Sequence, residues 1–264
     1  MLPSDPAVAE LLTRGRIEVE GRLVDASNAT LFCAISGGDA AAQCVYKPVS
    51  GERALWDFPD GTLAGREVAA YLVSQAAGVP LIPPTVLRQG PFGPGMVQLW
   101  VDTKEGDDLV DVLAPQDVPK GWRAVLRAHD RHGDPAVLVH ADHPSVRLMA
   151  ALDVVINNAD RKGGHVLHGT DGNVYGVDHG ICLHTENKLR TVLWGWLGEP
   201  LGEEAEAMLA TLADAVDTGL AERLAEHLTR AEVRAFGHRL EALRRTAVFP
   251  TPGQDHRAIP WPAF

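Results

Sequence analysis

The character of the chain changes near Val101. Before this point, short runs rich in β-branched and aromatic residues alternate with turns that contain Gly and Pro, and one long stretch, 63–77, has helical periodicity. After it, Ala, Leu, Glu and Arg dominate, above all between 201 and 246. Strands gathered in one part of a chain and helices in the other predict an α+β fold with two lobes, and not a series of alternating β and α units.

The same patterns predict individual elements. The N-terminal lobe, residues 1–101, is expected to contain helices at 6–14 and 63–77, strands at 16–24, 30–35, 43–47, 85–88 and 95–101, and a loop at 50–62. The C-terminal lobe, residues 102–264, is expected to be mainly helical, with a connection at 102–119, helices at 120–130, 143–157 and within 201–246, a hairpin at 165–178 and an extended tail at 249–264.

Composition limits the classes of function. Of 264 residues, 45% are hydrophobic and 22% charged, which is typical of a globular protein, and the net charge of −11 argues against a nucleic-acid binder. Three widely spaced cysteines and the lack of a signal-peptide pattern favour a reduced, cytoplasmic location. The most apolar helical stretch, 148–156, is short and interrupted by Asp153, so we expect no stable membrane insertion. The sequence indicates no oligomeric state.

Two residues of the first lobe suggest a bound phosphate compound. Lys47 ends a strand before Pro48, which would direct its ammonium into a cleft between the lobes, and Glu67 lies on the following helix. A carboxylate partner is how a buried lysine keeps its charge and its direction. Taken alone, the two residues are better explained as a surface lysine on an edge strand and a solvated glutamate.

Two aspartates of the second lobe complete the parts that phosphoryl transfer requires. Asp160 lies in a polar, Gly-containing loop between a helix and a strand, where it would orient a substrate hydroxyl, and Lys162 would follow the γ-phosphate. Asp178 ends a strand just before Gly180, a position that suits a metal ligand. Each segment alone is also ordinary turn chemistry, and the ordered set carries the prediction.

The four segments together resemble a known group of kinases. Val-Tyr-Lys-Pro (45–48), Arg-Glu-Val-Ala-Ala-Tyr-Leu (66–72), Asn-Ala-Asp-Arg (158–161) and Val-Asp-His-Gly (177–180) are similar to motifs of the atypical kinases related to phosphatidylinositol 3-/4-kinases. The resemblance is closest to type II phosphatidylinositol 4-kinases and HipA-type kinases, and to an uncharacterised actinobacterial branch of that superfamily. It spans roughly residues 20–245 and implies a two-lobed protein-kinase-like fold.

The resemblance also assigns roles. Lys47 matches the lysine that anchors ATP, Glu67 its helix partner, and Asp160 the catalytic aspartate. Asp178 matches the metal-binding aspartate. The hinge that faces adenine is matched by Gln98, Leu99 and Trp100, and the loop that covers the phosphates is matched by 25–30, which lacks Gly and would rely on Ser27.

One residue departs from the pattern of these kinases. His165 stands where they place a metal-binding Asn, and a neutral imidazole favours Mn²⁺ or Zn²⁺ over Mg²⁺. The expected ligands are therefore ATP and a divalent metal (Mg or Mn), and the phosphate acceptor is a small molecule or a protein. Two alternatives stay open: a nucleotide-binding pseudokinase that acts through partners, and an enzyme that transfers AMP.

A second group of histidines looks like a metal site. His129, His132, His140 and His143 occur in two pairs of matching spacing, but Gly-Asp-Pro (133–135) lies between the pairs and would break a shared helix. We therefore expect a polar loop between the lobes here, with structural zinc as the less favoured alternative.

Overall fold

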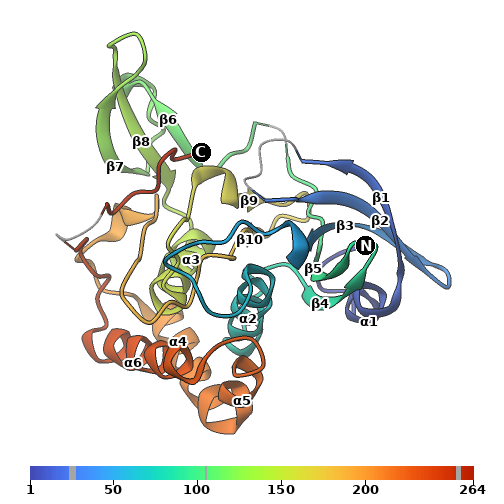
Figure 1. Cartoon of the computed structure of the whole chain (residues 1–264). Coiled ribbons are helices and arrows are strands. Elements are labelled where there is room, and N and C mark those ends of the chain that lie inside the picture. The colour runs from blue at the N-terminus through green and yellow to red at the C-terminus, as the bar shows by residue number, and fades with distance from the viewer. Residues whose placement is uncertain (24–27, 105, 254–256) are drawn as a thin grey trace.

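The first half of the chain forms an antiparallel sheet of five strands with two helices. The computed structural model describes residues 1–23, 28–104, 106–253 and 257–264. The elements of this part are α1 (Ala7–Arg14), β1 (Arg16–Arg22), β2 (Leu31–Gly37), β3 (Ala40–Pro48), η1 (Val49–Gly51), α2 (Leu63–Ala76), β4 (Thr85–Gly90) and β5 (Gly93–Leu99). The strands pair antiparallel in the order β1-β2-β3-β5-β4 (Figure 1), and the five strands predicted for this lobe are all present.

Strand β3 separates a packed face of the sheet from an open one. Cys44 and Tyr46 point to the side where α1 packs and are fully buried there. Because side chains alternate along a strand, Val45 and Lys47 face the opposite side. The alternation of the sequence therefore turns Lys47 away from the small core beneath α1.

Helix α2 begins where its free backbone amides find side-chain acceptors. Thr62 Oγ1 accepts a hydrogen bond from the Gly65 amide at 2.9 Å, and the two carboxylate oxygens of Glu52 accept from Leu63 and Ala64 at 3.0 and 2.8 Å. Capping of this kind satisfies the first amides of a helix and fixes the point at which it starts. It also ties the loop that precedes α2 to the helix that carries Glu67.

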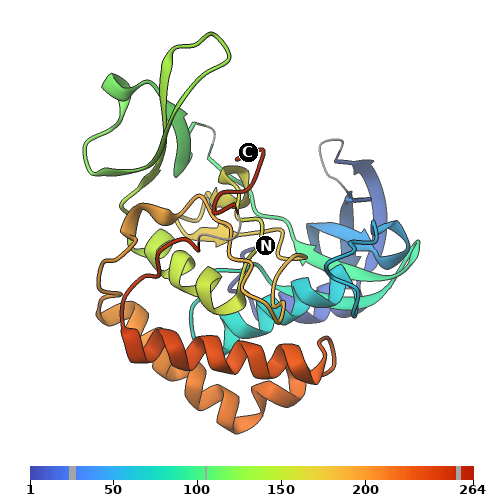
Figure 2. The same cartoon turned by 60° about the vertical axis from the view of Figure 1, so that its left-hand side comes forward.

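A second, three-stranded sheet follows β5 in the chain and corrects two expectations. Strands β6 (Val110–Leu113), β7 (Trp122–His129) and β8 (Pro135–Ala141) pair antiparallel in the order β6-β8-β7, with η2 (Pro115–Asp117) between the first two. The predicted helix at 120–130 is thus wrong, and 102–119 is not a plain connection. The sheet projects from the rest of the molecule in both views (Figures 1 and 2).

The physical reason lies in the pairing of β7 with β8. The Ala, Leu and Arg content of β7 favours a helix, but pairing with β8, whose Val137, Leu138 and Val139 are buried, overrides this local propensity. The register shifts between Ala124 and Leu126, so the period of two is broken within β7 itself.

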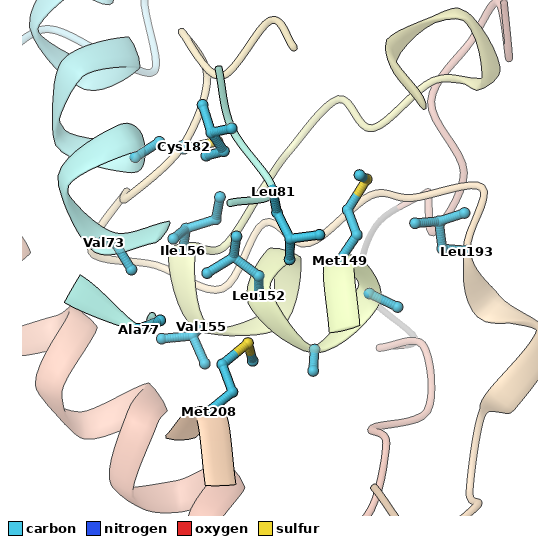
Figure 3. Packing of buried hydrophobic residues seen from close by; sticks show 14 of the residues in the cluster. Val73, Ala77, Leu81, Met149, Leu152, Val155, Ile156, Cys182, Leu193 and Met208 are labelled. Carbon is cyan, nitrogen blue, oxygen red and sulfur yellow. The ribbon is translucent and has the colours of Figure 1, made fainter. Parts of the chain in front are cut away.

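The remaining chain is mainly helical, as predicted. Its elements are α3 (Pro144–Ile156), η3 (Gly163–His165), β9 (Val166–His168), β10 (Val174–Gly176), η4 (Trp194–Trp196), α4 (Glu203–Ala215), η5 (Val216–Leu220), α5 (Ala221–Leu224) and α6 (Arg230–Thr246). Strands β9 and β10 form the expected hairpin. Figure 3 shows Val73 and Ala77, at the end of α2, packed against Leu152 and Val155 of α3 and Met208 of α4. Helix α2 therefore belongs to the core of the helical part as well as to the sheet.

A buried ion pair fastens α2 to the last helix. Arg66 is 2% exposed and donates to the carboxylate of Glu232, on α6, and to the carbonyl oxygens of Cys182 and Asp60. Glu232 in turn closes the capping box that begins α6 at Thr229. The position of α2 is therefore set by the helical part.

The tail after α6 returns to the loop that follows α3. The amides of Gly163 and Thr191 donate to the carbonyl oxygens of Ala263 and Ala258 at 2.8 and 3.0 Å. Phe264 packs on Gly163 so closely that a Cβ atom there would overlap its ring. Trp261, by contrast, is 82% exposed.

Candidate active site

Lys47 stands between two carboxylates from different parts of the chain. Its ammonium lies 2.7 Å from Glu67 Oε1 on α2 and 2.7 Å from Asp178 Oδ1, just past β10. Burial alone would lower the pKa of Lys47, but Asp178 and Glu67 outweigh it and hold that pKa above the ordinary value. The expected pairing of Lys47 with Glu67 is present, and the lysine is a fixed positive charge.

Asp178 lies in a turn that α2 also holds. Its backbone is left-handed, with φ 61°, an uncommon conformation for a residue other than Gly. The next amide, of His179, donates to Glu67 Oε2 at 2.8 Å, so one carboxylate of α2 binds both Lys47 and this turn. Lys47 is the main reason that the pKa of Asp178 lies well below its usual range. Asp178 is therefore ionised.

The loop that carries Asp160 begins where α3 ends. Asn157, with φ 54°, closes the helix in the left-handed conformation, and Asn158 Oδ1 accepts from the Asp160 amide at 3.0 Å. Burial raises the pKa of Asp160 to about 6; Asp178 acts in the same direction, whereas Lys162 and Arg190 oppose it. The ammonium of Lys162 lies 3.7 Å from Asp160 Oδ2. A carboxyl with this pKa is mostly ionised at neutral pH and can accept a proton.

A buried network joins this loop to the Asp178 turn, and our sequence reasoning did not foresee it. Arg161 binds Asp153 through Nε and Nη2 at 2.8 and 2.9 Å, and both side chains are fully buried. Its Nη2 also donates to His179 Nε2 at 2.6 Å. The sequence does contain an indication of this network, because Asp153 lies within an otherwise apolar helix and a buried aspartate needs a cationic partner.

His165 faces Asp178 through an unprotonated nitrogen. Its Nδ1 lies 3.1 Å from the Asp160 carbonyl oxygen, which can only accept, so Nδ1 carries the proton. Burial lowers the pKa of His165 to about 4, which keeps the ring neutral. The unprotonated Nε2 therefore lies 3.4 Å from Asp178 Oδ2. An imidazole nitrogen and a carboxylate oxygen that converge in this way fit a divalent metal ion.

A cavity of about 560 Å³ lies beside these residues, a size that suits a nucleotide-sized ligand. Its lining includes Val45, Lys47, Gln98, Leu99, Trp100, Val101, His165, Leu167, Val177 and Asp178. A smaller pocket, of about 40 Å³, has Asp160, Glu52 and Glu67 among its lining residues, and it shares Lys47 and Asp178 with the large one.

The structure thus brings together most residues that the sequence singled out. Lys47, Glu67, Asp160, Asp178 and their neighbours Lys162 and His165 surround the two pockets, and Gln98, Leu99 and Trp100 line the large one. Ser27 lies outside the described residues.

The four histidines do not form the loop that we expected. His129 ends β7, His140 is buried on β8, and His143 caps α3. Across the residues that the structure describes, no group of three or more His, Cys, Asp or Glu side chains is placed to hold a metal ion, so Asp178 and His165 converge only as a pair.

The element order and the lysine define a two-lobed, kinase-like fold. The third strand of the first sheet carries the lysine and the next long helix its glutamate partner, as in protein kinases. The chain belongs to the family of the Mycobacterium tuberculosis protein called Protein Rv2133c, to which it is 54% identical over 263 residues, 96% of this chain and 94% of that protein. The name of that relative states no activity.

Two further comparisons complete the picture. No family model matches the chain. The crystal structure of the Helicobacter pylori proinflammatory kinase CtkA superposes with a TM-score of 0.49 and 9% sequence identity, over 90% of this chain and 94% of that one. This likeness is too distant to add to what the geometry of the chain shows.

None of the helices in the described parts of the chain has the length and apolar character needed to cross a membrane.

Proposed function

We propose that this chain is an ATP-dependent phosphotransferase of the phosphatidylinositol-kinase-like superfamily. The observation that carries the proposal is Lys47, held between Glu67 and Asp178 at 2.7 Å from each, on the wall of a cavity of about 560 Å³. In this proposal residues 1–101 bind the nucleotide and residues 102–264 supply the catalytic groups. We further propose a cytoplasmic enzyme that does not act on nucleic acid.

The nucleotide would lie in the large cavity. Val45, Leu99 and Leu167 offer apolar walls to the adenine, and Lys47 neutralises the phosphates. The amides of Leu99 and Trp100 already donate to Pro84 and Gln43 at 3.0 Å each. The next amide, of Val101, has no partner among the described residues, so we place adenine recognition at this end of the hinge.

Asp178 and His165 would hold a divalent ion, Mg²⁺ or Mn²⁺. When bound, the ion neutralises the β- and γ-phosphates. An imidazole ligand favours Mn²⁺ over Mg²⁺ relative to the usual amide oxygen. The buried network around Arg161 keeps the loop that carries His165 aligned with the turn that carries Asp178, because Arg161 Nη1 donates to the carbonyl oxygens of both His165 and Val177.

Asp160 would act on the acceptor, a hydroxyl of an inositol compound, another small metabolite or a protein. As the hydroxyl oxygen bonds to the γ-phosphorus, the bond from that phosphorus to the bridging oxygen breaks and ADP leaves. The hydroxyl proton passes to the Asp160 carboxylate, which a pKa of about 6 leaves ready to receive it. Lys162 balances the charge of the moving phosphoryl group.

The test combines nucleotide binding with turnover. Calorimetric titration of ATP, with Mg²⁺ and with Mn²⁺, should show binding to the natural chain and to Asp160→Asn alike. ATP consumption should fall by about 10²–10⁴-fold in the variant. Equal consumption by both proteins would exclude Asp160 as the acceptor base, and absence of ATP binding would overturn the proposal.

A pseudokinase is the second candidate, and His165 in place of an Asn is the observation that favours it. Tight ATP binding without turnover by the natural chain would support it. If turnover occurs, the mass added to the acceptor distinguishes transfer of phosphate from transfer of AMP.

A further inference from the structure

A short segment runs beside the loop that carries Asp160. The amide of Arg190 donates to the Asn158 carbonyl oxygen at 2.9 Å, and the Arg190 carbonyl oxygen accepts from the Arg161 amide at 3.0 Å. The Val192 amide then donates to the Arg161 carbonyl oxygen at 3.1 Å. These backbone bonds fix the start of the Arg190 side chain next to Asp160, independently of any substrate.

Arg190 is the cation of this segment that has no ion pair within the part of the chain that the structure describes. Two nearby cations have carboxylate partners of their own: Lys188 pairs with Asp57 at 3.2 Å, and Arg161 pairs with Asp153. Arg190 forms no ion pair with a described residue, and its buried Nε has no hydrogen-bond partner there. Burying a guanidinium nitrogen without a partner is costly, so an anionic partner is expected.

The position of that charge matters because it acts on Asp160. Arg190 lowers the pKa of the Asp160 carboxyl, although the two side chains form no ion pair. Lys162, by contrast, pairs with Asp160 Oδ2 at 3.7 Å. A planar guanidinium binds phosphate and carboxylate through paired hydrogen bonds, which suits recognition of a group better than simple charge balance.

This inference rests on the proposed function. We infer that Arg190 binds an anionic group, a phosphate or a carboxylate, of the phosphate acceptor, the molecule whose hydroxyl Asp160 orients. The acceptor is then a hydroxy compound that already bears negative charge near the reacting hydroxyl. Arg190 forms no covalent bond in the reaction and acts as a specificity residue. The same chemistry is offered by a free phosphorylated polyol and by a phospholipid head group.

The test measures anion binding separately from nucleotide binding. The full chain, with Mg²⁺ or Mn²⁺ and ADP present, is titrated with glycerol 3-phosphate and, as its uncharged counterpart, with glycerol. A third arm uses phosphatidylcholine vesicles with and without phosphatidylinositol 4-phosphate. Arg190→Gln is compared with Arg131→Gln, an exposed arginine in the turn between β7 and β8.

We expect the phosphorylated probe to bind and glycerol not to bind. Arg190→Gln should weaken that binding at least tenfold and leave ADP affinity within twofold, Arg131→Gln should change neither, and Arg190→Lys should recover part of the loss. Binding to the soluble probe alone supports a free acceptor, and binding to the charged vesicles alone supports a lipid head group. In each case the binding must be lost in Arg190→Gln.

Three results overturn the inference: no binding of any charged probe to the natural chain, equal binding by Arg190→Gln, or a parallel loss of ADP affinity, which would place Arg190 at the nucleotide. If the chain binds the charged probe through Arg190 but neither binds nor consumes ATP, the anion site stands and the proposed function fails.

Discussion

The ammonium of Lys47 and the carboxylate of Asp178 lie 2.7 Å apart, although one ends a strand of the first sheet and the other follows the small hairpin of the helical part. This contact joins the two lobes at the point where both pockets meet. It also means that a bound metal and Lys47 would share Asp178, through Oδ2 on the side of His165 and Oδ1 on the side of Lys47.

Removing this lysine should disable nucleotide binding. In Lys47→Met, Glu67 and Asp178 lose their shared cation, and the phosphates lose their positive partner, so we expect ATP affinity to fall by at least about tenfold. Calorimetric titration measures the change. Lys120→Met, at an exposed lysine before β7, serves as the control. Unchanged ATP affinity in Lys47→Met would show that the cavity binds something else.

The identity of residue 165 should set the preference for metal. His165→Asn replaces an imidazole nitrogen with an amide oxygen, and we expect the affinity for ADP with Mn²⁺, relative to that with Mg²⁺, to fall on the order of tenfold. Titration of ADP with each metal gives the ratio directly. His129→Asn, exposed at the end of β7, should leave the ratio unchanged. An equal ratio in both variants would remove His165 from the metal site.

Activity should depend on the ionisation of Asp160. Because burial raises the pKa of this carboxyl from 3.8 to about 6, the ionised form predominates above that pH and kcat/KM should decline as the pH falls below it. His165, with a pKa of about 4, does not titrate in this window. Lys162 lowers the pKa of Asp160, so Lys162→Gln should move the midpoint to higher pH. A midpoint that stays in place would assign the titration to another group.

Much of this arrangement could be predicted from the sequence. Local periodicity of two or 3.6 residues, with turn residues between the segments, predicts most elements that carry the site. These are the strands around Lys47, the helix with Glu67 and the hairpin before Asp178. The ordered spacing of the four charged residues then indicated one site, and the structure places them around the same pair of pockets.

The rest depends on contacts that local patterns do not encode. Trp122–His129 became a strand because β8 supplies a partner, whereas its composition favours a helix. The contact of Arg190 with the loop of Asp160 is made entirely by backbone atoms, which carry no sequence signature. The ion pair of Arg66 with Glu232 joins residues 166 positions apart.

Substitution of Gly163 should displace the tail. A Cβ at this position would overlap the ring of Phe264, whereas a Cβ at Gly164 would meet no atom within 4 Å. We expect Gly163→Ala to lower the free energy of unfolding by about 1–3 kcal/mol and to make the tail easier to cleave. Urea unfolding and limited proteolysis measure the two effects, with Gly164→Ala as the matched control. Equal behaviour of the two variants would show that the tail does not rest on Gly163.

Breaking the ion pair between α2 and α6 should destabilise the whole chain. Arg66→Met leaves the buried Glu232 carboxylate without its cation, and we expect a loss of about 3–5 kcal/mol in the free energy of unfolding. The double variant with Glu232→Gln, which retains a capping-box residue, should recover part of that loss. Arg16→Met, at an exposed pair, should cost under about 1 kcal/mol. No recovery in the double variant would contradict an electrostatic origin.

The attachment of α2 has a consequence for control. In many protein kinases, the glutamate of the corresponding helix meets its lysine only when the helix is correctly positioned, and activation depends on that movement. Here Arg66 and a shared apolar core hold the helix to the other lobe. Turnover would then follow the supply of nucleotide and acceptor, with no separate activation step at this helix.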